Sequence, residues 1–125
     1  MKGENQPRGI RNRAMEYALR AVLVYRHLLG KRDDVARILG RQYLRSATSI
    51  GANLVEAQSG ERKRDFVHKC CIAQKEARES KYWLTLLQKS STITTSRLVP
   101  LLKETDELIA ILTRIIVNAK RSLST

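Results

Sequence analysis

Residues 41–87 carry the pattern that most constrains what this chain can fold into. Small and apolar residues recur there at alternating steps of four and three, a spacing that places them on one seam of a long helix. The seam consists of Phe66, Cys70, Ala73, Ala77, Ser80, Leu84 and Leu87, and the stretch before it has a matching face of Ser46, Ala47, Ile50, Gly51, Leu54 and Ala57. Because neither face is bulky at its centre, the pattern predicts two helices that approach each other closely.

The apolar periodicity on either side predicts two further helices. Residues 10–29 have the i, i+3, i+4, i+7 spacing of one buried face, and Gly30 is a suitable stop. Residues 97–121 repeat the four–three spacing, with Pro100 in the first turn, where its missing N–H costs little. Each outer helix is therefore expected to bury one face against the inner pair.

The inner helices are expected at about 34–58 and about 61–88. Asp33 or Asp34 is a plausible N-cap for the first of them. The hydroxyl-rich segment 90–96 is expected to be a loop, because its side chains compete for backbone hydrogen bonds. Short connections of this kind favour antiparallel neighbours.

Four helices joined in this way predict an all-α fold, most simply an up-and-down antiparallel four-helix bundle. A chain of 125 residues fits one domain, placed at 10–123, after a flexible N-terminal tail at 1–9. Ile109, Ile111 and Ile116 widen the apolar surface of the last helix. We expect that helix to make one contact inside the bundle and a second with another subunit.

The charge balance is strongly positive. Lys and Arg total 24 against 12 for Asp and Glu, a formal net charge of +12. Such an excess on a small domain attracts polyanions, and nucleic acid is the leading partner class. An anionic membrane surface, an acidic protein, or a role in solubility alone are the alternatives.

Two groups of basic residues are the best candidates for phosphate contacts. Residues spaced by four share one helix face, and a second cluster lies at the far end of the same helical hairpin. The candidates are Arg37, Arg41 and Arg45, then Arg62, Lys63 and Arg64, with Arg11 and Arg13 at the N-terminal edge. Lys75, Arg78 and Lys81 form a further group. Base stacking has little support, since only 5% of the residues are aromatic.

Polar residues that border the apolar seam are expected to form a structural hydrogen-bond network that sets helix register. They are Ser49, Asn53, Glu56, Glu76 and Glu79. The alternative is a carboxylate metal site, but a di-iron bundle needs Glu-x-x-His pairs, and this chain has none. Tyr82 and Trp83 are expected to pack at the bundle edge or at a subunit contact. The sequence predicts no metal, no cofactor and no enzymatic activity.

The two cysteines indicate a reducing location. Cys70 and Cys71 are adjacent, point about 100° apart on a helix and cannot form a relaxed disulfide with each other. A nucleophile pair with His68 is conceivable, but a buried structural cysteine is the commoner case. The chain has no apolar run long enough for a signal peptide or a membrane span, so a cytoplasmic protein without membrane contact is expected.

Residues 44–87 resemble the bacterial four-helix bundle proteins, also called 23S rRNA intervening-sequence proteins. The resemblance rests on Ser49, Ile50, Asn53, Glu56, Phe66, Leu84 and the run 73–79, with Ala57 where many members have glycine. It implies an up-and-down bundle that assembles into a homopentameric ring. It also implies similarity to the accessory variability determinant proteins of diversity-generating retroelements, basic barrels that bind nucleic acid and a reverse transcriptase.

The expected function is therefore that of a non-enzymatic, oligomeric accessory factor whose basic surface binds RNA or DNA through phosphates. The alternative is a scaffold oligomer that docks a protein partner, such as a reverse transcriptase, without physiological nucleic-acid binding.

Overall fold

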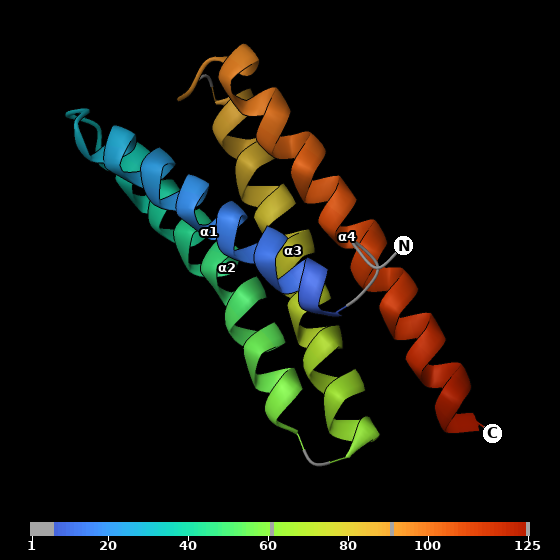
Figure 1. Ribbon diagram of the computed structural model, residues 1–125. Coiled ribbons are helices and arrows are strands. Elements are labelled where there is room, and N and C mark those ends of the chain that lie inside the picture. Colours follow the sequence, from blue (N-terminus) through green and yellow to red (C-terminus); the bar gives the residue numbers. More distant parts are fainter. Residues whose placement is uncertain (1–6, 61, 91, 125) are drawn as a thin grey trace.

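Four helices make up the described part of the chain, which covers residues 7–60, 62–90 and 92–124 of a computed structural model (Figure 1). The helices are α1 (Pro7–Leu29), α2 (Asp34–Ser59), α3 (Lys63–Lys89) and α4 (Thr95–Ser124). Consecutive helices run in opposite directions and pack side by side, and α1 touches α4 less extensively. The described residues include no strand, and the predicted all-helical fold is confirmed. None of these helices is both long and apolar enough to cross a bilayer.

The start of α2 follows the sequence prediction closely. Asp33 is extended, and its carboxylate accepts hydrogen bonds from the backbone N–H groups of Val35 and Ala36, at 3.1 and 3.2 Å. This side chain satisfies two of the donors that a helix N-terminus leaves open. The charged turn before α2 therefore sets where the helix begins.

The outer helices are longer than the sequence indicates. Residues 7–9 form the first turn of α1 instead of belonging to a tail, in keeping with the preference of proline for the first helical position. The rest of the predicted tail, residues 1–6, lies outside the described residues. Because α4 begins at Thr95, Pro100 falls in its second turn, where both it and Ser96 are exposed. Water can therefore solvate the Ser96 carbonyl that Pro100 leaves without an intrahelical donor.

The predicted seam of α3 forms the centre of the core. Its members Cys70, Ala73, Ala77, Ser80, Leu84 and Leu87 are buried, while Phe66 is half-buried beside the buried Val67. The matching residues of α2 are buried as well, except Gly51, which faces Ala14 of α1. The close contact between small side chains that the sequence predicts is therefore present between α2 and α3.

The apolar residues left exposed lie on α1 more than on α4. Ile111 and Ile116 of α4 are buried within the chain, so the surface expected to remain free for another subunit is largely covered. On α1, by contrast, Met15, Leu19 and Leu23 are each more than half exposed at successive steps of four. We call these three residues the α1 stripe. They form a continuous apolar edge along the outside of the bundle.

Buried hydroxyl groups form two pairs in the core, one between α1 and α4 and one between α2 and α3. The Tyr17 hydroxyl of α1 lies 2.6 Å from Thr105 Oγ1 of α4, and Ser46 Oγ of α2 lies 2.9 Å from Ser80 Oγ of α3. All four side chains are buried. Thr105 donates its own proton to the Leu101 carbonyl, so it accepts the proton of Tyr17. Burial, which outweighs these hydrogen bonds, raises the pKa of Tyr17.

We expect the substitution Thr105→Val to lower the free energy of unfolding by about 1–3 kcal/mol, because the buried Tyr17 hydroxyl loses its acceptor. Urea unfolding followed by circular dichroism measures the change. Adding Tyr17→Phe should remove the unpaired group, so the double variant should lose less stability than the sum of the two single losses. Strictly additive losses would show that the two hydroxyls do not stabilise each other.

Candidate nucleic-acid interface

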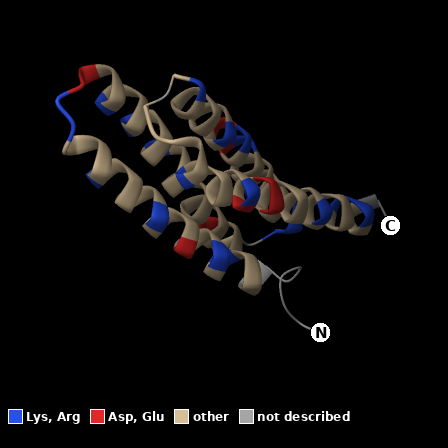
Figure 2. Cartoon of the chain, turned by 90° about the horizontal axis from the view of Figure 1, so that it is seen from above, with Lys and Arg blue, Asp and Glu red and all other residues tan. Residues whose placement is uncertain are grey.

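Basic residues occur on all four helices (Figure 2), and one helix face carries several of them at regular spacing. This face lies on α3, opposite its buried seam, and repeats the same alternating steps of four and three. Its residues are Arg64, His68, Cys71, Lys75, Arg78 and Tyr82, followed after one further heptad by Lys89. All of them are exposed except Cys71, which is half-buried. We call the six exposed residues the α3 ridge.

The permanent cations of the α3 ridge are not engaged in salt bridges with described residues. Within the described residues, Arg64, Lys75, Arg78 and Lys89 take part in no ion pair. Lys75 is near enough to Glu79 to help lower the pKa of that carboxyl, but the two are not paired. At 1.5 Å per residue, the ridge from its first to its last member is about 37 Å long. The result is an uncompensated row of positive charge along one side of the molecule.

A charge cluster between α2 and α3 borders the ridge. Arg45 of α2 reaches across to Glu79 and also lies 3.4 Å from Glu76 Oε1. The indole N–H of Trp83 donates to Glu79 Oε2 at 3.1 Å. Although partial burial acts to raise it, the hydrogen bonds from Trp83 and Arg45 lower the pKa of Glu79. The Glu79 carboxylate is thus held ionised, and its negative charge is neutralised by Arg45.

Two of the predicted phosphate contacts, Arg13 and Arg45, are neutralised by carboxylates of other helices. Arg13 is only 19% exposed and contacts Glu104 at 2.8 Å and Glu107 at 2.7 Å on α4. This pair ties α1 to α4 at the point where those helices come close. Neither arginine is available to a phosphate without breaking a bond between helices.

Three further candidates have partners close in sequence or space. Arg37 contacts Asp34 at 3.1 Å and donates to the Lys31 carbonyl at 3.2 Å. Arg62 lies 3.6 Å from Asp65 in a largely exposed pair, and Lys63 donates to Ser122 of α4. Exposed contacts of this kind are weak and can give way to a phosphate.

Arg41, Arg64 and Arg11 complete the predicted set. Arg41 and Arg64 are exposed and make no ion pair with described residues. Arg11 is half-buried, and its Nε atom has no hydrogen-bond partner among them. The structure therefore does not bring the predicted arginines together at one site, but it does place Arg64 on the α3 ridge.

The predicted polar network is divided between local bonds and ion pairs. Ser49 donates to the Arg45 carbonyl and Asn53 donates to the Ser49 carbonyl, both at 2.8 Å within α2. Glu56 pairs with Lys69 at 2.6 Å, whereas Glu76 and Glu79 share Arg45 as described above. Of these five predicted residues, only the three carboxylates therefore make the polar contacts described here between α2 and α3.

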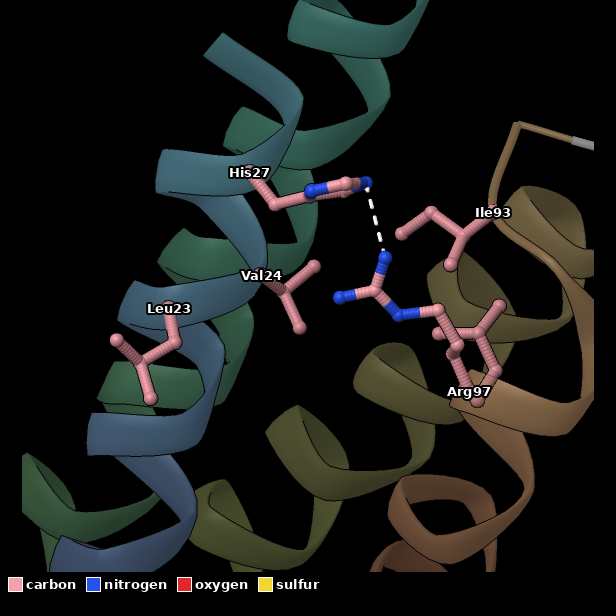
Figure 3. A pocket seen from close by; sticks show the side chains of 6 residues that line it. Leu23, Val24, His27, Ile93 and Arg97 are labelled. Atoms are coloured by element: carbon pink, nitrogen blue, oxygen red, sulfur yellow. Dashed lines mark hydrogen bonds between the residues drawn. The ribbon is translucent and has the colours of Figure 1, made fainter. Parts of the chain in front are cut away.

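Two of the hollows on the surface are lined by described residues alone. A small one, about 130 Å³, lies where α1 and α4 diverge, and Arg97 bridges it to His27 with 3.5 Å between Nη1 and Nε2 (Figure 3). A larger groove of about 310 Å³ runs between α1 and α2 over small residues such as Ala14, Ala18 and Gly51, with Arg11 at its edge. Neither is lined by a carboxylate or a thiol. In the described ranges, no group of three His, Cys, Asp or Glu side chains is placed to hold a metal ion.

Most of the α3 ridge and the aromatic pair beside it are missing from the predicted contact residues, although Lys75 and Arg78 form part of a further predicted group. The sequence does contain the pattern of the ridge. Its residues recur at the same steps of four and three as the buried seam, on the opposite face of α3. Trp83 is half-buried beside Glu79, as expected for the bundle edge, but Tyr82 is 59% exposed. The low aromatic content argues against base stacking. Composition does not show where each aromatic residue lies, and one of the few, Tyr82, lies among exposed cations.

The two cysteines differ in burial: Cys70 is buried and Cys71 is half-buried, so their thiols should differ in reactivity. Cys70 is buried in the α3 seam, and burial raises the pKa of its thiol to about 11. At pH 8 its thiolate should be about a hundredfold rarer than that of an ordinary cysteine. In the variant Cys71→Ser, we therefore expect iodoacetamide to modify Cys70 slowly in the folded protein and rapidly in urea, as followed by mass spectrometry. Equal rates in the two states would mean that Cys70 is accessible as thiolate.

The comparisons with known proteins agree with this architecture. The family described as 23S rRNA-intervening sequence protein matches residues 9–114. Among solved structures, a protein of unknown function from the S23 ribosomal protein family of Bacteroides thetaiotaomicron is 34% identical, with a TM-score of 0.82. The match covers 88% of this chain and 96% of that one. No curated protein sequence matches the chain. The chain belongs to the 23S rRNA-intervening sequence protein family.

Proposed function

We propose that this protein is a non-enzymatic accessory factor that binds RNA or DNA through phosphate contacts along the α3 ridge. The observation that carries the proposal is the row of exposed, unpaired cations on one face of α3, in a chain with a net charge of +12. Arg41 on α2 is a further unpaired cation that could join this surface. A cytoplasmic location with free thiols is part of the same proposal.

The dimensions of the α3 ridge suit a polyanion. Its length of about 37 Å is close to one turn of B-form DNA. Contacts between cations and phosphates release condensed counterions, so the affinity should fall steeply with salt and depend little on sequence. The ridge offers four permanent cations, Arg64, Lys75, Arg78 and Lys89, each able to meet one phosphate.

The double substitution Lys75→Gln with Arg78→Gln tests the site. Removing two phosphate contacts should weaken binding to every sequence and reduce the slope of log affinity against log salt by about 2. Fluorescence anisotropy with labelled RNA and DNA, from low to physiological salt, measures both quantities.

A matched control removes the same charge from α1, a helix whose backbone does not come close to that of α3 in the described part of the chain. Arg20→Gln with Arg26→Gln changes two exposed arginines of α1. We expect it to alter the salt slope much less than the ridge variant does. Equal effects would mean that the ridge is not the contact surface. No binding by the folded parent protein would reject the proposal and favour the scaffold alternative.

We also propose that the chain self-associates through the α1 stripe. Met15, Leu19 and Leu23 are exposed by 60%, 57% and 61%, and Met15 also lines a mainly apolar groove with small residues in its lining. Exposed apolar surface of this extent favours a protein contact. The family resemblance points to a homopentameric ring, and a ring or a smaller oligomer could equally serve as a scaffold for a protein partner.

The substitution Leu19→Glu should dissociate the oligomer, because it places a charge in the middle of the apolar contact. Light scattering after size exclusion should then give a mass near the 14.3 kDa of one chain. Val99→Glu on α4, at a residue 49% exposed, is the control and should leave the mass of the assembly unchanged. If the parent protein is already monomeric, self-association is rejected.

A further inference from the structure

One aromatic side chain lies in the middle of the α3 ridge. Tyr82 follows Arg78 by four residues and Lys75 by seven, and it precedes Lys89 by seven. These spacings place all four side chains on one face of the helix. The ring is 59% exposed although its neighbours along the ridge are cations.

The Tyr82 ring is braced by its neighbours. It packs edge to face against Trp83, with ring centroids 5.1 Å apart and an interplanar angle of 77°. Trp83 is half-buried and its indole N–H is bonded to Glu79, which in turn is held by Arg45 of α2. This chain of contacts fixes the support against which Tyr82 rests. A ring held in this way loses little conformational entropy when a ligand covers it.

An exposed aromatic ring flanked by cations matches the chemistry of unpaired nucleotides. Each base has an apolar face that stacks on an aromatic side chain, and the phosphates on either side need positive charge. Arg78 lies one helical turn from Tyr82, so one nucleotide could place its base on the ring and a neighbouring phosphate at the guanidinium. In a duplex the base faces are already covered by their neighbours and cannot reach the ring.

We propose that Tyr82 is a base-stacking residue and that the α3 ridge therefore prefers single-stranded nucleic acid to duplex. The inference rests on the proposed nucleic-acid binding and specifies which form is bound. The charge of the ridge argues for a polyanion, rather than an apolar protein surface, as the occupant of this position. Tyr82 adds affinity through its ring, while the ridge cations supply the salt-dependent part.

The test compares Tyr82→Ala and Tyr82→Phe with the parent protein, using a 20-nucleotide oligothymidylate and a DNA duplex of the same length. Loss of the ring should weaken single-strand binding by about 5- to 150-fold, and duplex binding by less than about twofold. The salt slope should not change, because no charge is removed. Tyr82→Phe keeps the ring and should bind like the parent. Trp83, the one tryptophan of the chain, should change its fluorescence when oligothymidylate binds the parent protein.

The outcomes separate this inference from the proposed function. Salt-sensitive binding by the parent protein that Tyr82→Ala leaves unchanged, or weakens equally for single strand and duplex, would overturn the stacking role alone. No binding by the parent protein at all would overturn both proposals. A lower oligomer mass for Tyr82→Ala, measured by light scattering, would place the ring at a contact between copies instead. Thermal unfolding of each variant confirms that the comparison is made on folded protein.

Discussion

The close contact between α2 and α3 is the constraint on which the other features depend. Ala47, Ala73 and Ala77 are fully buried, and the hydroxyl groups of Ser46 and Ser80 meet at 2.9 Å. Side chains of this size let two helix backbones approach, and each small residue would be difficult to enlarge without moving its neighbours. Because α3 buries this one seam, its rotation is set, and the opposite face is directed to solvent along the whole helix.

The distribution of charge follows from that arrangement. Several carboxylates lie between helices, where they pair with cations: Glu104 and Glu107 join α4 to Arg13, Glu79 joins α3 to Arg45, and Asp106 joins α4 to Lys81. These acidic side chains neutralise cations at the contacts between helices. Exposed cations such as those of the α3 ridge are left without an acidic partner among the described residues. The positive excess is therefore concentrated on surfaces such as the α3 ridge, where a polyanion can reach it.

The two surfaces proposed as functional lie on different helices and differ in character. The α1 stripe is apolar and lies on the first helix, whereas the α3 ridge is charged and lies on the third helix, whose backbone does not come close to that of α1 among the described residues. Self-association through one would leave the other free for nucleic acid. Repeating the ridge in several copies would raise the effective concentration of cations along one strand. The two proposals thus support each other without sharing residues.

The sequence by itself determined the four helices, a cap at Asp33 or Asp34 and the residues of the central seam, because these depend on periodicity and on interactions within a few residues. It also contained the spacing of the α3 ridge. What it could not determine was which cations remain unpaired. Arg13 and Glu104 are 91 residues apart, and Tyr17 and Thr105 are 88 apart. Such pairs depend on which helices become neighbours and how each is rotated about its axis. Only the tertiary packing decided this, and with it which basic residues face solvent without a partner.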